Sequence, residues 1–305
     1  MKRFILRRLA FSAVTLFVIS VVVFALARIG GDPLALMLDD YATPEQEAQL
    51  RVRLGLDRSY IHQYSIFIKN AARGDLGKRI LDQQSVMGAI MDRFPATLQL
   101  GLAAFIFSVA LGIPLGILSS VKRNSLWDHL GKLVALMGQS MPPFWLGIMM
   151  IFFFAVKLDW VNPSGREGWN SFILPTITLG WFFVAANMRI VRSAMLDVLD
   201  SEYIKLARAK GVSSGFVIWK HALPNAIIPP LTFMGITLGF LITGSVVAET
   251  VFQWPGLGML AFESVQKSDY PMLQGIVLVF GVMYIGTNFL VDILYAYIDP
   301  RIRYS

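Results

Sequence analysis

The sequence contains no cysteine among its 305 residues, and only 15% of those residues are charged. The absence of cysteine excludes disulfides, thiolate zinc sites and cysteine nucleophiles. The three histidines lie far apart, and none stands in a metal-ligand pattern such as H-E-x-x-H. A soluble domain usually has about 25% charged residues, so this chain has too few to cover a water-facing surface. These deficits argue against a soluble multidomain enzyme.

Long apolar runs take the place of the missing charge. Hydrophobic residues make up 55% of the chain, and the mean hydropathy is +0.60. Six runs contain neither a charged residue nor a histidine: Leu9–Ala27, Phe94–Val121, Leu133–Val156, Gly168–Met188, Ala222–Ala248 and Tyr270–Val291. Each is 19 to 28 residues long, and about 20 apolar residues suffice for a helix to cross the bilayer core. The pattern predicts an all-α membrane protein with six transmembrane helices.

The positive charges are distributed unequally between the two sides of these runs. Fifteen Lys and Arg residues lie in the two tails and the short loops of one side, and three lie in the short loops of the other side. The remaining nine lie in segment 28–93, which its length largely exempts from the positive-inside rule. Both termini are therefore expected in the cytoplasm. The net charge of +7 is read as a topology signal and not as a mark of nucleic-acid binding.

The first run resembles a signal peptide, because it follows Lys2, Arg3, Arg7 and Arg8 and ends in Ala25-Leu26-Ala27. Its 19 apolar residues exceed the usual hydrophobic stretch of about 7–15 residues in a cleaved signal. We expect it to be retained as the first transmembrane helix.

The ends of the runs divide the chain into four parts. These are the N-terminus with the first helix over 1–29, a periplasmic segment over 30–93, a membrane domain over 94–297 and a cytoplasmic tail over 298–305. In the periplasmic segment, Pro44 after Thr43 predicts a helix start, and Tyr60–Ala72 has helical spacing. Two interpretations of this segment stay open, a cap packed on the membrane domain or a docking surface for a soluble partner.

Bent helices are expected, because proline removes a helix hydrogen bond. Such residues inside the runs are Gly112, Pro114, Pro142, Pro143, Pro175, Pro229 and Pro230. No run has an ionisable residue near its centre, which disfavours a secondary transporter. Asp292 follows the last run, and Asn288 precedes it by one turn on the same face. We expect Asp292 to be a hydrogen-bonding group near the cytoplasmic end of the helix and not a coupling-ion site.

The chain also lacks an ATP site of its own. Gly74-Asp75-Leu76-Gly77-Lys78 has neither the spacing nor the Ser or Thr of a phosphate-binding loop. An intramembrane enzyme is disfavoured too, since neither H-E-x-x-H nor G-x-S-x-G occurs. ATP-driven transport would therefore need a partner that hydrolyses ATP and grips a cytoplasmic loop.

One cytoplasmic loop, residues 189–221, is large enough for that role. Its sequence predicts a short amphipathic helix after Asp200-Ser201 that stops at Gly211, and a second piece that returns to the membrane at Pro224. A solvated basic face is the alternative interpretation.

This loop closely resembles the EAA motif of ABC importer permeases, E-A-A-x-x-x-G-x9-I-x-L-P. Ala207, Gly211, Leu223 and Pro224 have the spacing of the motif, whereas Lys205, Leu206 and His221 replace its E, first A and I. Further segments resemble the dipeptide, oligopeptide, glutathione and nickel permease subfamily: Gly31-Asp32-Pro33, Leu54-Gly55-Leu56-Asp57, Gly74-Asp75-Leu76-Gly77, Phe94-Pro95-Ala96-Thr97-Leu98, Glu249–Gly258, Asp269-Tyr270-Pro271 and Asp299–Tyr304. The resemblance extends over nearly the whole chain.

The resemblance implies a type I ABC importer permease in the bacterial inner membrane, and not an enzyme. Expected partners are the lipid bilayer, a second related permease, two ATPases that bind ATP and magnesium, and a periplasmic solute-binding protein. No cofactor or metal is expected in this chain. Peptides are the expected solutes, with nickel chelates, glutathione, opines and oligosaccharides as alternatives.

Two sets of site residues follow from the resemblance. A coupling loop over about 193–222 is expected to contact an ATPase through Glu202, Tyr203, Ala207, Arg208, Lys210, Gly211, Leu223 and Pro224. A periplasmic gate and docking surface is expected from residues 30–93 with the loop Glu249–Tyr270, through Glu249, Trp254, Pro255, Gly256 and Asp269. Asp269, Glu263 and Lys267 are expected as rim charges of that surface. The Trp254 side chain is expected either to project towards a docked partner or to anchor the chain at the membrane interface.

Overall fold

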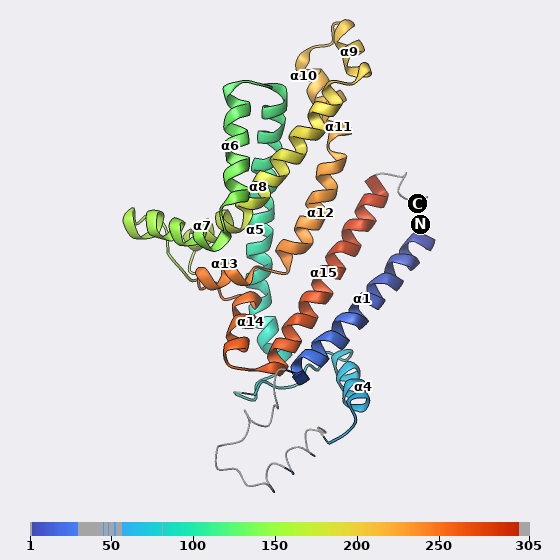
Figure 1. Ribbon diagram of the computed structural model, residues 1–305, viewed down its shortest axis with the longest axis vertical. Coiled ribbons are helices and arrows are strands. Elements are labelled where there is room, and N and C mark those ends of the chain that lie inside the picture. The colour runs from blue at the N-terminus through green and yellow to red at the C-terminus, as the bar shows by residue number, and fades with distance from the viewer. Residues whose placement is uncertain are drawn as a thin grey trace. The chain divides into compact units, whose positions relative to one another are not determined.

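The computed structural model describes residues 2–29, 45, 48, 52, 57–80 and 82–298. Within these residues the regular secondary structure is helical, apart from an isolated β-bridge between Lys78 and Ser85 (Figure 1). Four described helices are long and apolar enough to cross a membrane, or six when each of two bent helix pairs counts as one span. The expected helix start at Thr43-Pro44 and the segments 31–33, 54–56 and 299–304 lie outside the described residues.

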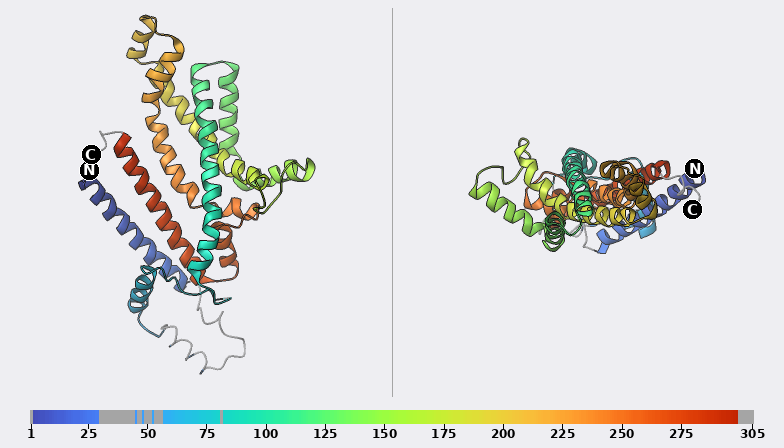
Figure 2. Two further views of the ribbon diagram at one scale, coloured as in Figure 1. Left: turned by 180° about the vertical axis from the view of Figure 1, so that it is seen from behind. Right: turned by 90° about the horizontal axis from the view of Figure 1, so that it is seen from above.

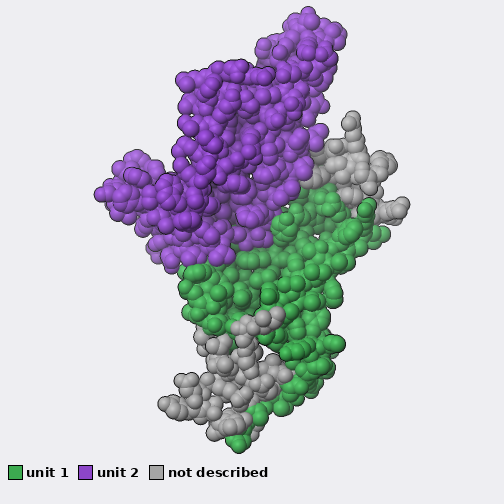
Figure 3. All heavy atoms as spheres, viewed as in Figure 1, with its two compact units in different colours: residues 1–97, 255–305 green, residues 98–254 purple. Residues whose placement is uncertain are grey.

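The chain forms two compact units, Met1–Thr97 with Pro255–Ser305 and Leu98–Trp254 (Figure 3). The first contains α1 (Lys2–Ile29), α4 (Tyr60–Ala71), α14 (Leu257–Gln266), α15 (Tyr270–Ile298) and the start of α5 (Val86–Val121). The expected linear division at residues 29, 93 and 297 does not follow these units. The C-terminal helices fold with the N-terminal segment.

The pairing of α1 with α15 explains that grouping (Figures 1 and 2). Arg8 and Asp292 form an ion pair of 2.9 Å, and Gln274 donates to the Val23 carbonyl at 3.3 Å. Gly281 lies against Ile19, where an added Cβ would be 3.2 Å from the isoleucine side chain. Because these contacts match the start of one helix to the end of the other, the two helices run antiparallel. Asp292 thus links two helices through its side chain.

Helix α4 confirms the helix expected over Tyr60–Ala72 and packs on α1. The Tyr64 hydroxyl lies 2.8 Å from Ser20 Oγ, and its ring contacts those of Phe17 and Phe24 edge-on. These contacts agree with the interpretation of this part of the segment as a cap.

The second unit is built around α8 (Asn170–Leu199), with α6 (Leu126–Ser140), α7 (Pro143–Met150), η1 (Ile151–Lys157), α12 (Ile228–Ile242) and α13 (Val246–Val251). Glycines on α5 and α6 allow their backbones to approach α8 closely. A Cβ at Gly116 would lie 2.7 Å from the Met188 carbonyl oxygen, and one at Gly138 would lie 2.5 Å from the Ala185 Cβ. Small residues at such contacts are the usual means of packing helices in a membrane, where no hydrophobic effect drives association.

We expect Gly112→Ala to destabilise the second unit by overpacking. The new Cβ would lie 2.6 Å from the Asn187 Cβ and 3.0 Å from the Val184 carbonyl oxygen, and such overpacking typically costs about 1–3 kcal/mol. Gly286→Ala is the matched control, because no atom lies within 4 Å of its added Cβ. Thermal unfolding in detergent should show a lower midpoint for the first variant and an equal or higher one for the second. Equal midpoints for both variants would refute the close packing of α5 on α8.

The third apolar run is a sharply bent pair and not one straight span. Helix α6 ends at Ser140, and Pro143–Lys157 continues at an angle of 106°. Pro142 and Pro143 lack the backbone N–H groups that would continue the helix, so the expected bend occurs at this pair. Pro114 and Pro175 lie inside α5 and α8 without ending either helix.

Two helices do not end where their apolar runs end. Helix α8 continues to Leu199, well beyond the end of its apolar run at Met188. The fifth run bends by 54° between α11 (Leu223–Ala226) and α12, beside Pro229, and α12 ends at Ile242. Gly244 then has a φ of +81°, a left-handed conformation that glycine adopts readily. The last residues of that run belong to α13, a separate helix.

Candidate functional site

The helix predicted in the loop after the fourth apolar run is present as α9 (Glu202–Ala209), at one end of the second unit (Figure 1). Ser201 precedes it in extended conformation, and Gly211 follows with a φ of +77°. Val212 N–H donates to the Ala207 carbonyl at 3.2 Å, and Gly211 N–H donates to the Arg208 carbonyl at 2.9 Å. This pair of bonds is a Schellman motif, which requires a left-handed residue after the helix. The stop expected at Gly211 is confirmed.

One face of α9 is fixed to the core of the second unit. Ile204 is fully buried in a cluster with Ile117 of α5 and with Met195 and Leu199 of α8, and Ala207 packs against this cluster. The short segments α10 (Ser214–Phe216) and η2 (Val217–Ala222) add further buried residues. The helix is therefore part of a packed body and does not hang from a free loop.

The part of the α9 surface next to this buried face is exposed and apolar. Tyr203 of α9 is 46% exposed and Leu206 is 56% exposed, while Phe216 and Trp219 of the following segments are 47% and 64% exposed. Exposed apolar groups gathered on one part of a chain indicate a surface that another molecule covers. Of these four residues only Tyr203 was expected from the sequence. Leu206, Phe216 and Trp219 could have been found in the sequence, because they are apolar residues in an otherwise polar loop.

Charged groups surround this face. Glu202, Arg208 and Lys210 are exposed, and Lys205 forms an exposed 2.7 Å ion pair with Glu202. Such surface pairs contribute little stability, so these charges stay available to a partner. Leu223 is partly buried and Pro224 is exposed in α11, where the chain turns towards α12. Within the described residues, no three His, Asp or Glu side chains gather in a way that could hold a metal ion.

Both interpretations of Trp254, projection towards a docked partner and anchoring at the membrane interface, are wrong. Its side chain is fully buried, edge-on against the Phe172 ring at a centroid distance of 4.6 Å, and the Arg166 guanidinium lies 5.9 Å from the ring centre. Glu249 is also fully buried, and its carbonyl accepts from Trp254 N–H at 2.8 Å. Burial of a large aromatic ring contributes a large favourable free energy. Neighbouring residues of the second unit bury the Trp254 ring.

Residues of the first unit that were expected to form a docking surface are also buried. Gly256 is buried at the start of α14, next to a partly buried Pro255, and Leu257 N–H donates to Thr97 Oγ1 at 2.7 Å. Asp269 is only 1% exposed.

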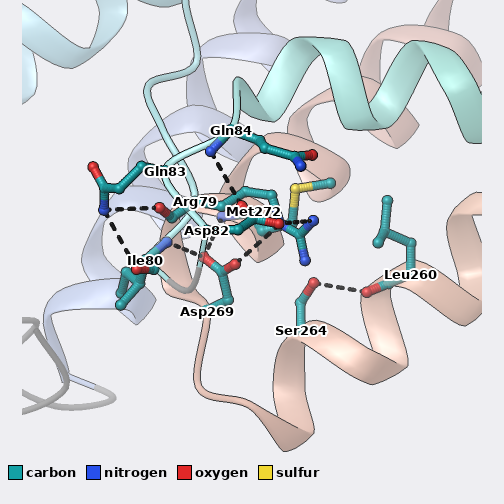
Figure 4. A network of polar contacts seen from close by, with 9 residues as sticks. All are labelled: Arg79, Ile80, Asp82, Gln83, Gln84, Leu260, Ser264, Asp269 and Met272. Carbon is teal, nitrogen blue, oxygen red and sulfur yellow. Dashed lines mark hydrogen bonds and ion pairs between the residues drawn. The ribbon is translucent and has the colours of Figure 1, made fainter.

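Asp269 is a structural hub and not a rim charge (Figure 4). Its Oδ2 lies 3.4 Å from Arg79 Nε, and its Oδ1 accepts from the backbone N–H groups of Ile80 at 3.3 Å and Met272 at 3.4 Å. The bond to Met272 satisfies a free donor in the first turn of α15, as a helix N-cap does. Arg79 also pairs with Asp82 at 2.9 Å. The expectation of a rim charge is wrong for this residue, because its carboxylate is used inside the chain.

Comparison with known families gives two matches that together take in most of the chain. The model described as "Binding-protein-dependent transport system inner membrane component" matches residues 112–304. The model described as "Binding-prot-dependent transport system membrane comp, N-term" matches residues 1–101.

Individual proteins match over the full length. The glutathione transport system permease protein GsiC of Escherichia coli O6:H1 is 42% identical over 310 residues, with 100% of both chains covered. The protein of the same name from Shigella dysenteriae serotype 1 is 41% identical over 310 residues, again with 100% of both chains covered.

A solved structure of the MetNI methionine ABC transporter in an inward-facing conformation is similar in fold. The TM-score is 0.60 at 20% identity, with 70% of this chain and 97% of that chain covered. At this identity the likeness concerns the fold alone, and it confirms the type I importer permease fold expected from the sequence.

Proposed function

The chain belongs to the family of binding-protein-dependent transport system inner membrane components, and from that premise we propose that it imports glutathione. As a member of this family it is a permease subunit of an ABC importer in the inner membrane, and it is not itself a catalytic enzyme. We assign ATP hydrolysis to two partner ATPases, half of the pathway to a second permease, and delivery to a periplasmic solute-binding protein. Both termini are placed in the cytoplasm, in line with the bias of basic residues.

The full-length similarity to glutathione permeases carries the choice of solute. Glutathione is a modified tripeptide, so it lies within the peptide-like solutes expected from the sequence. Dipeptides and oligopeptides are the second candidate, favoured by the sequence segments shared with that subfamily.

Coupling to the ATPase is assigned to the exposed face of α9 and the segments that follow it. Tyr203, Leu206 and Trp219 would enter a cleft of the ATPase, and Arg208 and Lys210 would meet acidic groups at its rim. The conformation of the loop is assigned to the partly buried Ala207 and Leu223 and to the exposed Gly211 and Pro224. Closure of the ATPases on ATP would then move α9 together with the core to which Ile204 fixes it. Nucleotide binding would thereby shift the population between two states of the permease.

On the periplasmic side, we assign contacts with the binding protein to segment 30–93 and to exposed side chains of the loop Glu249–Tyr270. Phe262 and Lys267 of the first unit are exposed there. Trp254 and Asp269 are buried, so we assign them a structural role in the loop and no contact with the binding protein.

Uptake into proteoliposomes tests the function. The complex of this chain with its second permease and ATPases would be reconstituted with ATP in the lumen, and the binding protein and labelled glutathione would be added outside. We expect uptake that requires both ATP and the binding protein, and that an excess of unlabelled dipeptide does not reduce. Competition by the dipeptide would favour the second candidate. Uptake that needs neither ATP nor the binding protein would overturn the importer assignment.

A further inference from the structure

A buried carboxylate with two cationic partners lies at the end of the second unit from which α9 extends. Asp128, in the first turn of α6, has a side-chain exposure of 0%, whereas its partner Arg192 on α8 is 21% exposed. Isolated charges are expensive to bury, so a buried carboxylate must be paired and hydrogen-bonded. The two residues are separated by 64 positions in the sequence, and only the fold brings them together.

Both oxygens of this carboxylate are engaged. Oδ1 accepts from Arg192 Nε at 2.7 Å and from Ser119 Oγ at 2.5 Å. Oδ2 accepts from Arg192 Nη2 at 3.1 Å, from Asn124 N–H at 3.1 Å and from Lys132 Nζ at 2.9 Å. The arginine thus makes a two-pronged contact, which fixes orientation as well as distance. Ser119 closes the arrangement by also lying 3.1 Å from Arg192 Nε.

The cluster joins three helices at one point. Ser119 belongs to the end of α5, Asp128 and Lys132 to the start of α6, and Arg192 to the last third of α8. Helix α8 runs only two further turns before α9, and Ile204 of α9 lies in one buried cluster with Leu199 of α8 and Ile117 of α5. A displacement of α9 therefore reaches α8 through packing, and it reaches α6 through the charged cluster. A buried ion pair adds little net stability relative to an apolar contact of the same volume, so its main consequence is geometric.

We propose that Asp128 and Arg192 are positioning residues for energy coupling, which lock α5, α6 and α8 into one rigid lever that the ATPase moves through α9. This inference rests on the proposed function, since it assigns a task within the same transport cycle. Neither residue touches ATP or solute. Their effect is to prevent α8 from sliding past α6 when α9 is pulled, so that motion is passed on and not absorbed locally.

The test measures solute imported per ATP hydrolysed in reconstituted complexes carrying Asp128→Asn or Arg192→Lys. The first variant keeps the shape of the side chain and removes its charge. The second keeps the charge and removes the two-pronged geometry. We expect the ratio to fall about tenfold in Asp128→Asn, within the usual range of coupling between sites, and by a smaller factor in Arg192→Lys. The ATPases should stay bound in both variants.

Arg123→Gln is the matched control, because the ion pair of Arg123 among the described residues is an exposed one of 3.5 Å with Asp200. The ratio of this variant should equal that of the wild type. A merely structural role would lower the amount or the melting temperature of the complex and leave the ratio unchanged, and this result would overturn the proposal. If Asp128→Asn fails to assemble, Arg192→Lys decides by the same ratio. Absence of ATP-driven uptake by the wild type would instead reject the proposed function.

Discussion

Gly211→Val is expected to reduce ATP-driven import at least about tenfold, because a β-branched residue in left-handed conformation costs about 1–3 kcal/mol. The native φ is +77°, and this angle allows the bonds that close α9. Relief of the strain would reorient the chain after the helix and displace the exposed Phe216 and Trp219. Import and binding-protein-stimulated ATP hydrolysis, both measured in proteoliposomes, check the result.

The variant Gly211→Asn distinguishes the effect of backbone conformation from the effect of side-chain size. No atom lies within 4 Å of a Cβ added at this position, so neither side chain is excluded by space. Asparagine tolerates the left-handed region, and this variant should keep most of the import. Equal loss in both variants would show that glycine is needed for another reason, and normal import with valine would contradict the assignment of this loop to coupling.

Asp269→Ala is expected to destabilise the first unit severely, by about 3–5 kcal/mol, which is the usual cost of removing one partner of a buried ion pair. The change leaves Arg79, which is only 16% exposed, without one of its two carboxylates. It also frees the backbone donors of Ile80 and Met272. Thermal unfolding of the purified permease complex gives the measurement.

Charge variants of the same loop provide the comparison. Lys267 is exposed and Glu263 is partly exposed, so Lys267→Ala and Glu263→Ala should change stability by no more than about 0.5 kcal/mol. Asp269→Ala in an Arg79→Ala background should cost less than in the wild type, since the two residues interact. If Asp269→Ala leaves the unfolding midpoint unchanged but weakens stimulation by the binding protein in a salt-dependent way, the rim interpretation is right after all.

Features with a local cause were predictable from the sequence. The helix Tyr60–Ala71, the stop at Gly211 and the bend at Pro142-Pro143 follow from spacing, from the freedom of glycine and from the missing N–H of proline. The apolar runs also predicted membrane helices, since a helix satisfies the hydrogen bonds of its own backbone in lipid.

The ends of the helices were less predictable than their existence. An apolar run stops at the first charged residue, whereas a helix can continue through charged residues. Helix α8 continues to Leu199 with charged residues in its last turns, and one of them, Arg192, is held by Asp128. In the sequence, Arg192 and Lys132 contribute only to the bias of basic residues. Their pairing with a buried carboxylate depends on contacts between helices that no local pattern records.

The sequence by itself determined that this is an all-helical permease of an ABC importer, because membrane helices, the loop motif and the family likeness are all written in consecutive residues. Only the tertiary structure decided which side chains face outward. Trp254 and Asp269 stand in a loop that suggests exposure, yet Phe172 and Arg79 cover them. Whether a side chain is buried depends on neighbours that are distant in the sequence. For these two residues such neighbours turn side chains predicted to form a docking surface into buried side chains that support the fold.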